Sequence, residues 1–445
     1  MAASGSSSKA KSFQAPRGTR DFFPREMALR RQIETCWRDA SINWGFQEIE
    51  GPTFEHLDLY TVKSGPGIVS ELFSFERSGG DTTYALRPEF TPTLARMAVA
   101  KGNALPVPTK WFSIPCLFRA ERPQRGRLRE HVQWNVDILG LSDADTDAEL
   151  ISVAVAALDR LGLDPSMVQV KYSHRDVVAR LLTDLGVTAE HLPAAFDLLD
   201  RRDKMPGDVF TEKATAFGLD EKAVSRFDQL AHACTAPGED PSTLVDVPAE
   251  DLDHLTALHQ ALVHHGIADW CHVDLGIVRG LAYYTGTVFE IHETSGAERA
   301  IAGGGRYDHL VELFGGPATP ACGFGMGDVV LSLVLQDRGL IDPDTLGPCP
   351  DAFVVCVDDA VSDHVVPTVA RLRTAGLHAR RSYKSTRNLG KLLKEAGQQK
   401  ARIAVILGGE LQEGIVAVKD LQAGEQQAVP LGELESTVLK LLATP

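Results

Sequence analysis

The sequence predicts an α+β protein with three parts: a domain built on an antiparallel sheet flanked by helices, a helical insertion inside that domain, and a separate C-terminal α/β domain. Three observations support this class. Short β-like runs separated by turn residues dominate about residues 70–140, between two amphipathic helices. Leucines at helical spacing fill residues 171–265. Beyond residue 349, strand-like and helical patterns alternate.

The first domain begins after a polar lead, residues 1–16, that we expect to be disordered. Pro24 opens a long helix with apolar residues at every third or fourth position, and Gly45 ends it. A strand follows before the turn at Gly51-Pro52. Further strands are expected at 71–76, 82–86, 110–119 and 131–138, and a helix at 145–161. This order places helices against an antiparallel sheet.

The domain boundaries follow from changes in pattern. We place the first domain at residues 17–170 and 266–340, the helical insertion at 171–265, and the last domain at 349–445, after a linker rich in Pro, Asp and Gly. Strands return at 271–275 and 287–292, and glycine-dense loops follow them. In the last domain we expect strands at 352–357, 378–382 and 403–407 and helices at 365–375 and 389–395.

Composition excludes several classes of protein. No apolar stretch approaches the roughly 18 residues of a membrane span. The polar first residues lack the apolar segment of a secretory signal. The seven cysteines are widely spaced and include no C-x-x-C pair, which argues against a disulfide framework or zinc ribbon and indicates a reducing cytoplasm. The net charge of −15 argues against a protein that coats nucleic acid indiscriminately.

The densest chemical signal is a run of five arginines between residues 119 and 129. Arginine presents a planar fork of donors that suits phosphate oxygens. A proline and a glycine break this run into a hairpin loop, which would direct Arg119 and Arg127 into one pocket and leave Arg122 and Arg125 at the tip. A solvated basic loop is the alternative interpretation.

A row of polar side chains follows on the next predicted strand. Gln133, Asn135 and Asp137 alternate with apolar residues, so Gln133 and Asp137 face the same side of the strand. Such a row fits the binding of a small polar substrate. An amphipathic strand with its polar face in water would show the same pattern.

Two later segments combine tyrosines with an arginine or with glycines. Arg279 precedes Tyr283 and Tyr284, and three glycines precede Arg306 and Tyr307. Glycine lets a ligand approach the backbone closely. The sequence contains no dinucleotide fingerprint, Walker phosphate loop or nucleophile elbow. The histidines between 254 and 265 lack the spacing of a zinc site, so we expect no metal bound by the protein itself.

Together these motifs resemble the histidyl-tRNA synthetases, a family of class II aminoacyl-tRNA synthetases, over about residues 17–440. The segments that carry the resemblance, in the family's order, are 18–24 (GTRDFFP), 45–52 (GFQEIEGP), 86–91 (LRPEFT), 118–129, 279–284 (RGLAYY) and 303–308 (GGGRYD). The resemblance implies a class II catalytic domain, a C-terminal anticodon-binding domain, and a cytoplasmic homodimer whose interface includes the helix and strand around residues 37–52.

The resemblance also implies a reaction and a set of residue roles. L-histidine and ATP would form histidyl-adenylate, with Mg²⁺ held mainly by the ATP phosphates, and the histidyl group would then pass to the 3′ end of tRNA(His). Arg119 and Arg279 are the expected catalytic cations. The implied histidine-binding residues are Glu89, Phe90, Thr91, Arg119, Gln133, Asp137, Arg279, Tyr283, Tyr284 and Tyr307. The implied ATP contacts are Arg119, Glu121 and Arg127, and those of the tRNA acceptor end are Arg122, Gln124 and Arg125.

Two further features bear on this function. Ten Lys or Arg residues and one acid lie between residues 371 and 402, and such a basic surface suits a tRNA anticodon stem. Val330 stands where class II enzymes usually have the arginine of their third motif, His131 where an aromatic residue is common, and Ala282 where many relatives have an acid. The alternative function is that of a non-catalytic relative, either the regulatory subunit of ATP phosphoribosyltransferase or a tRNA or histidine sensor.

Overall fold

The computed structural model describes residues 13–64, 66–244, 247–278 and 283–443. The chain divides into two compact units, Met1–Leu346 and Gly347–Pro445. None of the helices in these residues is long and apolar enough to cross a membrane. All seven cysteines are free thiols.

The first unit is built on a nine-stranded sheet. In order across the sheet its strands are β1 (Gln47–Glu48), β5 (Thr109–Ser113), β7 (Glu130–Leu139), β12 (Ala321–Gly327), β11 (Ala302–Arg306), β10 (Thr287–Glu293), β8 (Val168–His174) and β9 (Cys271–Val273), and β6 (Cys116–Phe118) also pairs with β7. Neighbouring strands are antiparallel except at the two edges, where β1 pairs with β5 and β8 pairs with β9 in parallel. The predicted antiparallel sheet is therefore correct at its centre, and the whole sheet is mixed.

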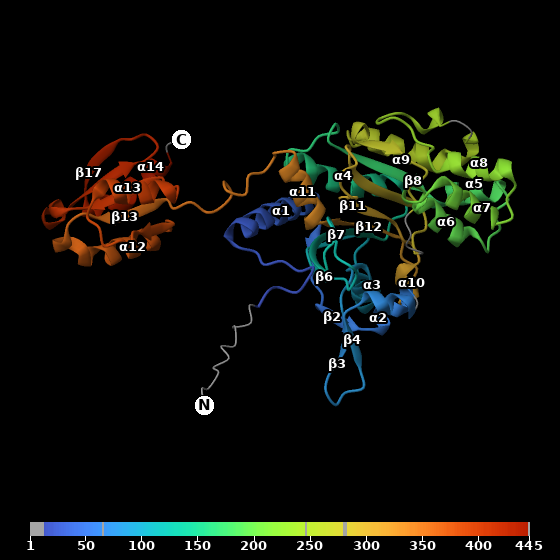
Figure 1. Ribbon diagram of the computed structural model, residues 1–445, viewed down its shortest axis with the longest axis horizontal. Coiled ribbons are helices and arrows are strands. Elements are labelled where there is room, and N and C mark those ends of the chain that lie inside the picture. The colour runs from blue at the N-terminus through green and yellow to red at the C-terminus, as the bar shows by residue number, and fades with distance from the viewer. Residues whose placement is uncertain (1–12, 65, 245–246, 279–282, 444–445) are drawn as a thin grey trace, which may run out of the picture. The chain divides into compact units, whose positions relative to one another are not determined.

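Two helices predicted from the sequence pack on this sheet (Figure 1). They are α1 (Pro24–Asn43) and α4 (Ala144–Arg160). Pro24 is compatible with the first turn of α1, where no backbone donor is needed. Asp143 caps α4 by accepting a 2.8 Å hydrogen bond from the Thr146 amide. Trp37 of α1 is fully buried and stacks on Trp134 of β7, with ring centroids 5.9 Å apart.

The glycine-dense segments expected to be loops are instead the central strands β11 and β12. Local preference favours a turn at three consecutive glycines, but here close packing of strands decides. A Cβ atom at Gly304 would lie 2.6 Å from the Phe324 Cβ, and one at Gly305 would lie 2.5 Å from the Thr287 carbonyl oxygen. Only strands without side chains at these positions can approach so closely.

A smaller three-stranded sheet projects from the first unit (Figure 1). Its strands, in order, are β2 (Phe54–His56), β4 (Thr83–Leu86) and β3 (Ser74–Glu76), and the helices beside it are α2 (Asp58–Ser64), α3 (Thr91–Lys101) and α10 (Leu310–Leu313). The strand predicted at 110–119 is interrupted at Ile114-Pro115 and forms β5 and β6. The strand predicted at 71–76 is shorter, because residues 66–71 form a 3₁₀ turn.

The predicted helical segment consists of α5 (Arg175–Asp184), α6 (Leu192–Asp200), α7 (Gly207–Thr215), α8 (Glu221–Leu230) and α9 (Asp253–His264). Its leucines share one hydrophobic core with the sheet; Leu182 and Phe227 belong to the same buried cluster as Val170. The boundary expected at residue 171 falls inside β8, which pairs with β10 along its whole length. The helix α9 packs against α4. Separation of this segment as a domain of its own stays a prediction.

The second unit has its own five-stranded sheet, with the order β14 (Ala379–Arg381), β13 (Ala352–Cys356), β15 (Ile403–Leu407), β16 (Ile415–Asp420) and β17 (Gln426–Pro430). Its helices are α12 (Val365–Thr374), α13 (Leu389–Gln398) and α14 (Leu434–Leu442). The helix α11 (Asp328–Asp337), which directly follows β12, belongs to the first unit. The first three strands are parallel and the last two are antiparallel, so the predicted α/β domain is confirmed with a mixed sheet. The strands β16 and β17 and the helix α14 were not anticipated.

Candidate active site

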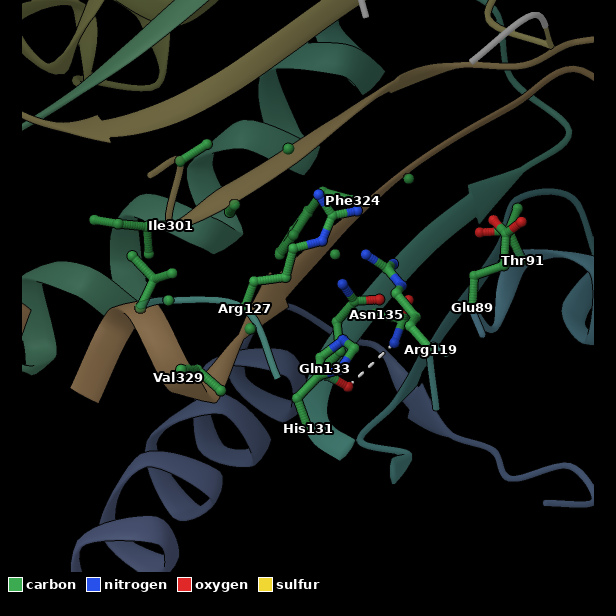
Figure 2. Close-up of a pocket in the computed structure, with 18 of the residues that line it drawn as sticks. Glu89, Thr91, Arg119, Arg127, His131, Gln133, Asn135, Ile301, Phe324 and Val329 are labelled. Carbon is green, nitrogen blue, oxygen red and sulfur yellow. Dashed lines mark hydrogen bonds between the residues drawn. The ribbon is translucent and has the colours of Figure 1, made fainter. Parts of the chain in front are cut away.

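A pocket of about 240 Å³ opens above the glycines of β11 and β12. Glu89 and Thr91 lie at one end of the pocket (Figure 2). Ile301 and Val329 lie at the other end, and the arginines and polar side chains of the β6–β7 region lie between them. The site therefore has an acidic end, a cationic middle and an apolar end.

The arginine-rich segment forms the predicted hairpin loop. Gln124 and Arg127 exchange two backbone hydrogen bonds of 3.0 and 2.9 Å. The turn between them needs a left-handed residue, which Gly126 supplies with a φ of +72°. Arg119 and Arg127 both line the pocket, so the prediction that the hairpin brings them together is confirmed.

The three residues assigned to the tRNA acceptor end, Arg122, Gln124 and Arg125, are exposed on the same loop. Arg125 is not free at the tip, because it forms ion pairs of 2.5 Å with Glu298 and 3.1 Å with Asp337. These contacts attach the loop to the β10–β11 connection and to α11. Arg125 therefore anchors the loop, whatever else it contacts.

The electrostatics of the pocket favour anions. Arg127 forms an ion pair with Glu121. Arg119 donates a 3.1 Å hydrogen bond from Nε to the Pro88 carbonyl and has no ion pair with any described residue. Burial, together with Arg119 and two other arginines, lowers the pKa of His131 to about 3. His131 therefore lines the pocket as a neutral imidazole at physiological pH.

Gln133 and Asp137 face the same side of β7, as predicted, and both lie against glycines of β12. A Cβ atom at Gly325 would lie 2.7 Å from Gln133 Cδ. A Cβ atom at Gly323 would collide with the Asp137 carboxylate. The absent side chains of β12 thus provide the space that these polar groups occupy. Asn135, between them, also lines the pocket and donates a 3.1 Å hydrogen bond to the Gln133 carbonyl (Figure 2).

Asp137 is buried beneath the pocket and accepts a short hydrogen bond from the Tyr307 hydroxyl. Burial raises the pKa of Asp137 to about 7, although the Tyr307 hydrogen bond acts in the opposite direction. Tyr283, Tyr284 and Tyr307 all line the pocket, and the ring of Tyr283 lies 4.7 Å from that of Tyr284 and 5.9 Å from that of Tyr307. These side chains form a polar aromatic wall.

The remaining predicted residues are placed differently. The side chain of Phe90 is buried in the core with Leu94 and Trp111 and does not line the pocket, because it precedes the first turn of α3 and points into the packed interior. Arg279 lies outside the described residues. The pocket also has apolar lining residues that were not predicted from the sequence, including Ile301, Phe324 and Val329. Nothing in the pattern distinguishes such residues from ordinary core.

A larger cavity of about 810 Å³ continues from this pocket toward the helical segment. Glu89, Arg119 and Arg127 border both spaces. The far side carries the basic residues Arg201, Arg202 and Lys204. Acidic side chains, among them Asp197 and Asp200, lie beside them, so the pocket is accessible from a wide space of mixed charge.

Comparison with known proteins identifies the family to which this sequence is similar. The sequence model of the family described as histidyl-tRNA synthetase matches residues 18–328, and that of the anticodon binding domain matches residues 351–441. A histidine–tRNA ligase from Natronomonas pharaonis is 37% identical over 93% of this chain and 95% of its own length. The chloroplastic and mitochondrial histidine–tRNA ligase of Arabidopsis thaliana is 36% identical over 94% of this chain and 85% of its own length.

Solved structures agree on the fold. The crystal structure of a histidyl-tRNA synthetase from Nostoc has a TM-score of 0.77 and 23% identity and covers 97% of this chain and 99% of that one. A Bacillus halodurans structure titled as an ATP phosphoribosyltransferase regulatory subunit/histidyl-tRNA synthetase has a TM-score of 0.70 and 21% identity, covering 90% of this chain and 99% of that one. At that identity it shows the fold alone, and the curated relatives do not favour the non-catalytic alternative. With a family model matched over most of its length, a second matched C-terminal domain and relatives aligned nearly end to end, the chain belongs to the histidyl-tRNA synthetase family.

Proposed function

We propose that this chain is a histidine–tRNA ligase of the cytoplasm. It would activate L-histidine with ATP to histidyl-adenylate and pyrophosphate and transfer the histidyl group to the 3′ end of tRNA(His). The observation that supports this best is the order of groups along the pocket, with an acid at one end, arginines in the middle and tyrosines above a buried carboxyl. That order suits an amino acid and a nucleotide placed end to end.

The chemistry follows from the charges. A carboxylate oxygen of histidine attacks the α-phosphorus of ATP in line, a P–O bond forms, and the bond to the pyrophosphate oxygen breaks. Two anions must approach each other, so fixed cations at the α-phosphate lower the barrier. Arg119 is the first candidate, since it lines the pocket without a counter-ion among the described residues. By family resemblance, Arg279 is the second.

Substrate selection uses the acidic end and the aromatic wall. Glu89 and Thr91 would bind the ammonium group, and Gln133 the carboxylate region. Tyr284, Tyr307 and the Asp137 carboxyl would hydrogen-bond the imidazole. A site built to satisfy a polar ring rejects apolar analogues strongly, because those analogues leave buried polar groups unpaired.

Mg²⁺ would enter bound to the phosphates of ATP. Glu121, beside Arg127 at the border of the larger cavity, is an oxygen donor that could complete the coordination of such an ion. When bound, the ion would neutralise charge on the leaving pyrophosphate.

The tRNA would contact both units. Its 3′ end would pass through the larger cavity to the exposed loop with Arg122 and Gln124. In the second unit, Tyr383 is 81% exposed and carries the Arg381 guanidinium 4.5 Å from its ring centre. An exposed ring flanked by cations suits an unstacked base of the anticodon loop.

We also propose a homodimer. Phe54 and Phe75 of the small sheet are 48% and 43% exposed and contact each other edge to face, and Phe73, just before β3, is 38% exposed. Apolar surface of this kind marks association sites. The interface around residues 37–52 would use the exposed parts of α1 and β1, since Trp37 itself lies in the core.

The decisive experiment measures histidine-dependent exchange of labelled pyrophosphate into ATP, followed by charging of tRNA(His). The proposal expects both activities. A protein that binds histidine or tRNA without any exchange would be a sensor or regulatory subunit, and that result would overturn the proposal.

A further inference from the structure

Beside the apolar end of the pocket lies one arginine, Arg299, that has no ion pair with a described residue. Arg299 lies on the connection between β10 and β11, directly before Ala300 and Ile301, which line the pocket. Its side chain is exposed, and it forms no hydrogen bond or ion pair with any of the residues the structure describes. No role in the resemblance or the proposed reaction includes this residue.

Three other arginines of the loop and its surroundings already have acidic partners. Arg125 is held by Glu298 and Asp337, and Arg127 is paired with Glu121. Arg20 forms a 2.7 Å ion pair with Asp328, at the start of α11. Each of these arginines has an acidic partner before any ligand binds, whereas Arg299 forms no ion pair with a described residue.

The geometry directs Arg299 to the arginine loop. A Cβ atom built on Gly126 would lie 3.3 Å from Val330 Cγ2 and 3.7 Å from Arg299 Cδ, so both side chains lie against the loop at this glycine. Gly126 and Val330 both line the pocket. The neighbouring Glu298 side chain is only 4% exposed and accepts a 2.6 Å hydrogen bond from Arg125 Nε, so it holds the β10–β11 connection against the arginine loop. Arg299 is thus attached to a constrained backbone at the rim.

We propose that Arg299 binds the terminal phosphates of ATP, next to the valine that stands where the third motif usually has an arginine. A triphosphate carries more negative charge than Arg119 and the Glu121-paired Arg127 can balance, and an exposed guanidinium with an anchored backbone can bind oxygens through two donors. This inference rests on the proposed function. In this proposal Arg299, on the β10–β11 connection, makes the phosphate contact that Val330 of α11 cannot make.

The test compares Michaelis constants in the pyrophosphate exchange reaction for the wild type, Arg299→Ala, Arg299→Lys and Arg226→Ala. Arg226 is a matched control, because it is an exposed arginine on α8, away from the pocket, with no ion pair among the described residues. Loss of a charge-assisted hydrogen bond should raise the KM for both ATP and pyrophosphate about tenfold or more in Arg299→Ala. The KM for histidine and the thermal midpoint should stay at wild-type values.

A second variant makes the result specific. In Arg299→Ala/Val330→Arg, a guanidinium returns to the same end of the pocket from α11, and the KM for pyrophosphate should recover most of its loss. Arg299→Lys should recover part of it. Unchanged KM values for ATP and pyrophosphate in Arg299→Ala would overturn the proposal. A rise for ATP alone would also overturn it, because that would place Arg299 at the base.

Failure of the proposed function is distinguishable. If the wild type showed no histidine-dependent exchange, the ligase assignment would fail first. Calorimetric titration of the wild type and Arg299→Ala with ATP and with pyrophosphate would then still measure whether Arg299 binds phosphates.

Discussion

Asp137 is a buried carboxyl whose pKa in the folded protein, about 7, lies above the ordinary value of 3.8. The folded state therefore retains a proton that the unfolded chain releases. The protonated Asp137 carboxyl contributes fully to the free energy of unfolding below about pH 4, and this contribution is lost as the pH rises through 7. Between these two pH values the free energy of unfolding falls by about 1.4 kcal/mol for each unit of pH increase.

Asp137→Asn removes this titration while keeping an oxygen that accepts from Tyr307. We expect the difference in unfolding free energy between variant and wild type to change with pH between 4 and 7 in favour of the variant at the higher pH. Urea denaturation at several pH values measures it. Parallel profiles for the two proteins would contradict the assignment of that titration to Asp137.

Arg279 carries the other prediction at this scale. If its guanidinium contacts the α-phosphate, Arg279→Ala should slow adenylate formation about 10²–10³-fold, since it removes a preorganised donor to developing charge. Rapid-quench kinetics at saturating histidine and ATP measure this step. A raised KM with nearly unchanged kcat would instead indicate a ground-state contact.

At the scale of elements, β12 offers a graded series of glycine-to-alanine substitutions. At Gly323 the new methyl meets Asp137 and the Tyr307 hydroxyl, both buried, so we expect a loss of about 1–3 kcal/mol of stability. At Gly325 its three nearest atoms all belong to the end of the Gln133 side chain, so the KM for histidine should rise with a smaller loss of stability. Gly327→Ala, with nothing within 4 Å, is the control for stability. Equal thermal midpoints for Gly323→Ala and Gly327→Ala would refute this account.

Elements with a strong local signal were predictable. The helix opened by Pro24 and the convergence of Arg119 and Arg127 follow from spacing and turn residues alone. The central strands β11 and β12 were mistaken for loops, because glycine favours turns locally and only the tertiary contacts reveal why it stands in a strand. Phe90 was assigned to the site from a motif, but packing places its side chain in the core.

For the whole molecule, two units with separate hydrophobic cores allow a test by deletion. Removing residues 347–445 should reduce tRNA charging much more than histidine-dependent pyrophosphate exchange, because the pocket lies wholly in the first unit. Rates of both reactions, with circular dichroism to check folding, measure the effect. An equal loss of both in a folded protein would mean that the second unit supports adenylate chemistry.

Association is the other property at this scale. The 48.2 kDa chain should sediment as a species of about twice that mass at micromolar concentration. Phe54→Glu/Phe75→Glu should shift it toward the monomer, since these exposed rings would otherwise be covered by the partner. A wild-type monomer would contradict the proposal.

The glycine strands have a consequence for redesign of substrate scope. Gly303, Gly323, Gly325 and Gly327 line the pocket without side chains, so mutation at these positions can only add atoms, and laboratory evolution there can select smaller substrates but never larger ones. Enlargement has to come from trimming the tyrosines that also line the pocket, and under the proposed function truncation of Tyr284 or Tyr307 would remove a hydroxyl that hydrogen-bonds the imidazole. Under the proposed function, substrate breadth and fidelity would depend on the same tyrosine side chains, and a variant that accepts a bulkier amino acid should discriminate less well among the smaller ones.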